Sequence, residues 1–92
     1  MTHGYTKESE ALLKRLARIE GQVRGISGMV DDDRYCIDIL TQSGAVQAAL
    51  DKVSLALIDG HVRHCVLGAE GALREERAEE LLGAVGRLMR MR

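Results

Sequence analysis

The sequence predicts an all-α protein made of three helices, of which the second is the longest. Apolar side chains recur every three or four residues along three separate stretches, which is the period of an amphipathic helix. The 92 residues include no proline, the residue that most strongly interrupts helices. We find no convincing strand pattern, so no sheet is expected.

The first helix is predicted by the apolar series that begins at Leu12 and ends at Val30. Thr6 or Ser9 is a suitable N-cap for it, because a hydroxyl can accept a hydrogen bond from the first turn. Residues 1–6 are small and polar, and they are expected to form a mobile arm.

Three aspartates at positions 31–33 interrupt the pattern and predict a short turn, in which the second or third aspartate would cap the next helix. The second apolar series runs through residues 36–65. Gly68 and Gly71 mark its end. The third helix is expected over roughly residues 75–91.

The length and composition predict one domain over residues 1–92 that assembles into an oligomer. The chain has no phenylalanine or tryptophan and only two tyrosines, so a single copy builds a thin core. It has no signal peptide and no apolar run of membrane-spanning length, which predicts a cytoplasmic protein with no membrane partner. Thiols stay reduced there, so a disulfide is not expected.

The two cysteines and one histidine are the candidate metal ligands. His61 and Cys65 are four residues apart, so on a helix they lie on one face and form half of a site for a soft ion. Cys36 precedes His61 by 25 positions, which is about 38 Å along a continuous helix at 1.5 Å per residue. One ion cannot join them within such a chain.

Pairing the second helix with its own copy solves this problem. If two copies lie antiparallel about an axis near Leu50, Cys36 of one comes beside His61 and Cys65 of the other, twice per dimer. Two sulfurs and one imidazole favour copper(I), whereas zinc would require a fourth ligand. The competing geometry is a kink at a glycine that folds the chain back on itself.

Three segments carry a resemblance to the copper-sensing operon repressor family (CsoR-like): residues 15–26 (RLARIEGQVRGI), residues 33–40 (DRYCIDIL) and the His61-x3-Cys65 motif. The resemblance implies an antiparallel dimer with a four-helix bundle, paired into a tetramer as a dimer of dimers. It implies a repressor that binds operator DNA without a helix-turn-helix and is released by copper(I). Cys36, His61 and Cys65 match the family's copper ligands.

The resemblance also implies roles beyond the ligands. Tyr35 and Glu80 match residues that couple the metal to DNA binding. His3 is similar to the N-terminal histidine that nickel/cobalt-sensing relatives use as an extra ligand. Basic residues used on DNA correspond to Arg15 and Lys52, and Lys14 and Arg18 are their neighbours in the sequence.

Other functions stay open. A persulfide or redox sensor would cross-link the two cysteines, but it needs no imidazole. A nickel/cobalt-sensing repressor would share the fold, and a copper-buffering helical oligomer would never meet DNA. The net charge of −1 does not by itself indicate nucleic-acid binding. No constellation of nucleophile, acid and base suggests an enzyme.

Overall fold

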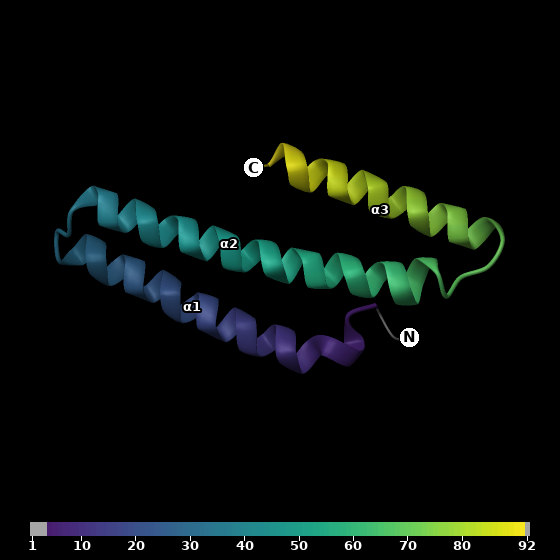
Figure 1. The fold of residues 1–92 in the computed structure, drawn as a ribbon, viewed down its shortest axis with the longest axis horizontal. Coiled ribbons are helices and arrows are strands. Elements are labelled where there is room, and N and C mark those ends of the chain that lie inside the picture. Colours follow the sequence, from purple (N-terminus) through teal and green to yellow (C-terminus); the bar gives the residue numbers. More distant parts are fainter. Residues whose placement is uncertain (1–3, 92) are drawn as a thin grey trace. The chain divides into compact units, whose positions relative to one another are not determined.

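The computed structural model describes residues 4–91, and helices account for 86% of it. The all-α prediction is confirmed: the described residues form three α-helices and no strand (Figure 1). No helix in this range is long and apolar enough to cross a membrane. The elements in order are a 3-10 turn (Thr6–Glu8), α1 (Ser9–Asp31), α2 (Cys36–His61), a π-helical turn (Val62–Val66) and α3 (Ala72–Arg90).

The chain divides into two compact units. The first, here the hairpin unit, comprises residues 8–55, which are α1 and most of α2. The second, here the terminal unit, comprises residues 1–7 and 56–92, of which 4–7 and 56–91 are described. Because α2 runs through both units, we keep the proposal that residues 1–92 form a single functional domain.

The turn between α1 and α2 differs from the predicted capping. Asp32 closes α1, because its backbone N–H donates to the carbonyl of Gly28 at 2.9 Å. Asp33 adopts a left-handed φ of 55°, which aspartate tolerates better than most residues. The residue directly before α2 is Tyr35, whose carbonyl accepts the first helical hydrogen bond. An aspartate cap of α2 was therefore the wrong prediction.

The start of α1 also differs. Its N-cap position is Glu8, whose side chain forms no capping hydrogen bond. The 3-10 turn over Thr6–Glu8 leads directly into the α-helix, so Ser9 becomes its first residue instead of its cap. Short 3-10 turns at helix ends are common because they satisfy backbone groups that α-helical bonding leaves free.

The core of the hairpin unit is thin, as the composition predicts. Only four apolar side chains of the described residues are buried, and all belong to this unit. Leu40 and Leu55 on α2, in contrast, expose 65% and 64% of their surface. Exposed apolar side chains of this size favour burial against a further surface. The buried four are Leu12 and Ile19 of α1, and Val46 and Val53 of α2.

In the terminal unit, α2 ends at His61, one turn earlier than the sequence predicts. The chain continues as a π-helical turn, in which the N–H of Leu67 donates to the carbonyl of Val62, five residues back, at 2.8 Å. Gly68 follows this turn and lies close to His64, since a Cβ at position 68 would be 2.7 Å from the His64 carbonyl oxygen. Single π turns inside helices occur often at functional sites.

The N-terminal segment packs against the end of α2. Gly4 is buried, and its backbone lies so close to Gly60 that a Cβ on either residue would be 2.6 Å from the other's carbonyl oxygen. This differs from the expected mobile arm over residues 1–6, as far as residues 4–6 are concerned. Two facing glycines explain the contact, because only they permit this approach of backbones.

Gly60→Ala is expected to displace the N-terminal segment while leaving α2 helical. Alanine favours a helix over glycine by about 1 kcal/mol, but its Cβ collides with the Gly4 carbonyl. Hydrogen exchange should show faster exchange of the backbone amides of residues 4–8. Gly44→Ala in the same helix is the control, because no atom lies within 4 Å of its added Cβ. Unchanged exchange in Gly60→Ala would contradict the contact.

Candidate metal site and nucleic-acid interface

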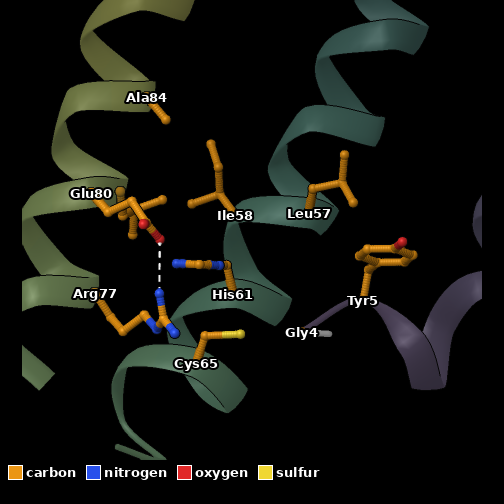
Figure 2. Close-up of a pocket in the computed structure, with 10 residues that line it drawn as sticks. Gly4, Tyr5, Leu57, Ile58, His61, Cys65, Arg77, Glu80 and Ala84 are labelled. Atoms are coloured by element: carbon orange, nitrogen blue, oxygen red, sulfur yellow. Dashed lines mark hydrogen bonds and ion pairs between the residues drawn. The ribbon is translucent and has the colours of Figure 1, made fainter. Parts of the chain in front are cut away.

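A hollow of about 490 Å³ in the terminal unit, here the terminal hollow, contains two of the predicted metal ligands. His61, the last residue of α2, and Cys65, in the π turn, both line it (Figure 2). Gly4 and Tyr5 form part of its wall, and α3 forms another part. The two residues of the predicted half-site thus line the same hollow, within one compact unit. The side chains lining it from α3 are Arg77, Glu80, Leu81 and Ala84.

The His61 side chain has a buried ring nitrogen, Nε2, without a hydrogen-bond partner among the described residues. Figure 2 shows the imidazole projecting from α2 toward Arg77 and Glu80 on α3. A buried polar atom without a partner costs free energy, so such atoms in folded proteins call for an explanation.

Metal ligation would account for this geometry. Histidines that bind a metal through one ring nitrogen donate the other N–H to a carboxylate or carbonyl, which fixes the ring's orientation. With Nε2 directed toward α3 and its Glu80 carboxylate, Nδ1 is the nitrogen left for an ion. The thiol of Cys65 supplies a soft donor from the next turn. These residues therefore fit a soft metal such as copper(I).

Cys36 does not join this half-site within the chain. It is the first residue of α2, belongs to the hairpin unit and is an exposed free cysteine. Residues 4–91 of a single copy contain no group of three histidine, cysteine or acidic side chains able to hold a metal. Because α2 continues unbroken from Cys36 to His61, the alternative of a chain folded back at Gly44 or Gly60 is wrong.

The residues implied to couple metal and DNA have contrasting environments. Glu80 lines the terminal hollow beside His61, where its Oε1 accepts a hydrogen bond from Nη1 of Arg77 at 3.4 Å. Tyr35, next to Cys36, exposes 68% of its surface. His3 lies outside the described residues. Sequence reasoning missed Arg77, although its spacing of three from Glu80 on a helix was visible.

A second hollow, of about 640 Å³, lies between α1 and α2 in the hairpin unit and is here called the basic hollow. All four predicted DNA-binding residues line it: Lys14, Arg15 and Arg18 from α1, and Lys52 from α2. The α2 side is built mainly of alanines, so the long basic side chains surround a space instead of filling it.

The electrostatics of the basic hollow favour an anionic partner. Among the described residues, none of the four cations forms an ion pair with a carboxylate, whereas Arg24 farther along α1 pairs with Glu20. Gln22 also lines the hollow, and its Oε1 is buried without a hydrogen-bond partner in the same part of the structure. Sequence reasoning missed Gln22, which follows Arg18 by one helical turn.

Comparisons with known proteins show which family and which solved structures the chain resembles. The model of the family described as metal-sensitive transcriptional repressor matches residues 8–87. The copper-sensing transcriptional repressor RicR of Mycobacterium tuberculosis H37Rv is 48% identical over 96 residues, covering 96% of this chain and 95% of RicR.

Two solved structures have similar folds. The copper-sensing repressor CsoR with Cu(I) from Geobacillus thermodenitrificans NG80-2 superposes with a TM-score of 0.85 at 46% identity, covering 90% of this chain and 88% of that one. The nickel-responsive transcriptional regulator InrS superposes with a TM-score of 0.74 at 40% identity, covering 85% and 89%. The fold thus serves sensors of at least two metals.

Proposed function

This chain belongs to the metal-sensitive transcriptional repressor family, and we propose that it is a copper(I)-responsive repressor of this family. The resemblance inferred from the sequence is thereby confirmed. Membership in a repressor family agrees with the expectation that the chain is not an enzyme. The metal-free protein binds operator DNA in the cytoplasm, and copper(I) releases it.

The observation that carries the choice of metal is the half-site in the terminal hollow. It offers one thiolate and one imidazole whose second nitrogen is already directed to the Glu80 side, and a second thiolate exists only on Cys36. Two sulfurs and one nitrogen suit copper(I), which would supply a soft centre that holds these three side chains together. Similarity to copper-sensing RicR and CsoR supports the same ion.

We propose that the third ligand comes from a second copy of the chain. In an antiparallel α2–α2 pair, the exposed Tyr35 and Cys36 of one protomer reach the terminal hollow of its partner. The exposed leucines on α2 supply the apolar contact that such a pair requires. Two dimers then assemble into the tetramer that the family resemblance implies.

The basic hollow is proposed to bind the DNA backbone. Four unpaired cations around one concave surface suit phosphate groups, which dominate the affinity of proteins for DNA. DNA and copper(I) favour different states of the same assembly. By linkage, the factor by which copper weakens DNA binding equals the factor by which DNA weakens copper binding.

Mixing two inactive variants tests the intersubunit site. In a heterodimer of Cys36→Ala and His61→Ala, one site has lost two residues and the other keeps Cys36, His61 and Cys65. Random pairing should therefore restore about a quarter of the copper sites. The readout is copper(I) bound per protomer in competition with a chelator, after the mixed proteins are unfolded and refolded together.

A matched mixture supplies the control. Cys65→Ala and His61→Ala remove residues of the same half-site, so their heterodimer contains no complete site and should recover no copper binding. Recovery in both mixtures, or in neither, would rule out a site shared between Cys36 of one protomer and the half-site of its partner.

Nickel sensing is the second candidate, and the similarity to InrS favours it. A divalent ion would require a fourth ligand, for which the N-terminal His3 is the candidate. Release of operator DNA by nickel(II) but not by copper(I) would establish this alternative, and a His3→Ala variant that loses the response would identify the ligand. A redox sensor would instead release operator DNA when an oxidant alone is added. A copper-buffering oligomer would not bind operator DNA at all.

A further inference from the structure

One ion pair lines the terminal hollow, and its arginine is less exposed than the arginines of the other ion pairs in the described residues. Arg77 donates to Glu80 across one turn of α3, with 3.4 Å between Nη1 and Oε1. The Arg77 side chain is 38% exposed, whereas the arginines of the other three ion pairs are 54–72% exposed. The Arg77 side chain is therefore partly withdrawn from solvent at the position where His61 projects, while the Glu80 side chain is 60% exposed (Figure 2).

His61 and Arg77 can both donate a hydrogen bond to the Glu80 carboxylate. The buried Nε2 of His61 has no partner, and the Glu80 carboxylate is the acceptor to which the imidazole is directed. In the observed arrangement Glu80 bonds to Arg77 and leaves His61 unsatisfied. The guanidinium therefore holds the carboxylate that the imidazole requires.

We propose that Arg77 is a positioning residue that competes with His61 for Glu80 and so sets the concentration of copper(I) at which the repressor responds. In the metal-free state Arg77 holds Glu80. When His61 uses Nδ1 as a ligand, its Nε2–H donates to Glu80 and Arg77 loses that contact. This inference rests on the proposed function, and it adds a residue that opposes the metal-bound state.

The competition has a defined sign. An interaction present only in the metal-free state stabilises that state, so removing it makes copper(I) binding tighter. Partly exposed ion pairs contribute little, which corresponds to about a twofold to fivefold change in an equilibrium constant. If Arg77 merely oriented Glu80 for His61, its removal would weaken copper binding instead. The sign of the change separates the two roles.

Arg77→Met is expected to bind copper(I) about twofold to fivefold more tightly in a chelator competition. Release from operator DNA should occur at a correspondingly lower free copper concentration, while metal-free DNA affinity stays within about twofold of the parent. The copper(I) affinity of Arg77→Lys should lie between those of the parent and Arg77→Met, because lysine keeps the charge but lacks the planar guanidinium. Arg87→Met removes the same charge from an exposed position of α3 and should change neither copper affinity nor release.

A double-mutant cycle tests whether Arg77 acts through Glu80. In a Glu80→Gln background, Arg77→Met should no longer change copper affinity, because the carboxylate for which the two side chains compete is gone. An equal effect in both backgrounds, weaker copper binding, or a change matched by Arg87→Met would overturn the inference. Thermal unfolding of the full-length metal-free variants checks that each remains folded.

The same measurements separate this inference from the proposed function. If His61→Ala loses the copper response while Arg77→Met behaves like the parent, only the role of Arg77 fails. If His61→Ala keeps the response, the proposed metal site itself is wrong.

Discussion

Cys36→Ala and Cys65→Ala proteins are each expected to bind operator DNA like the parent and to stay bound when copper(I) is added. Either change leaves one sulfur and one nitrogen, which is too few donors for a trigonal copper(I) site. Loss of a residue outside the ligand set already costs 10- to 100-fold in metal affinity, so loss of a ligand should cost more than about 100-fold. Fluorescence anisotropy of labelled operator DNA at buffered free copper measures both steps.

The control for this experiment is His64→Ala. His64 immediately precedes Cys65, is exposed and does not line the terminal hollow, so its removal should leave copper-driven release unchanged. A normal response in Cys36→Ala would show that Cys36 is not a ligand, and the proposed Cys36/His61/Cys65 site would be wrong. A response lost in His64→Ala as well would mean that the π turn, and not its thiolate, determines the response.

The helices could be predicted from the sequence because apolar spacing reports directly on the buried face of a helix. The residues at which α2 begins and ends could not be predicted in this way. A spacing of four residues keeps His61 and Cys65 on nearly the same face in an α-helix or a π turn, so the motif does not distinguish them. Aspartate favours both turns and helix caps, and at Asp33 the left-handed turn conformation won.

Some residues of the candidate sites could likewise be predicted from the sequence, and others could not. His61 and Cys65 combine a chemical type with a spacing, and both are visible in a sequence. That Glu80 belongs beside them came from the family resemblance. Arg77 and Gln22 were missed because a spacing of three or four residues between polar side chains is common on helices and does not by itself mark a site. Their importance depends on which helix faces them, and apolar periodicity does not determine the helix partner.

Arg15→Ala is expected to weaken binding of the metal-free protein to operator DNA by about tenfold or more and to reduce the salt dependence of that binding by about one unit of slope. Arg15 lines the basic hollow and has no carboxylate partner among the described residues, so its charge is available to a phosphate. Each phosphate contact releases condensed counterions from DNA, which is why its loss lowers the slope. Anisotropy titrations at several salt concentrations provide both numbers.

Arg24→Ala is the matched control, because Arg24 is on the same helix but pairs with Glu20 at 3.2 Å and lies outside the basic hollow. It should change DNA affinity and salt slope little. Copper(I) affinity should be unchanged in both variants when no DNA is present, because neither arginine lines the terminal hollow. If Arg15→Ala and Arg24→Ala weakened DNA binding equally, the effect would reflect net charge alone. The basic hollow would then not be the surface that DNA contacts.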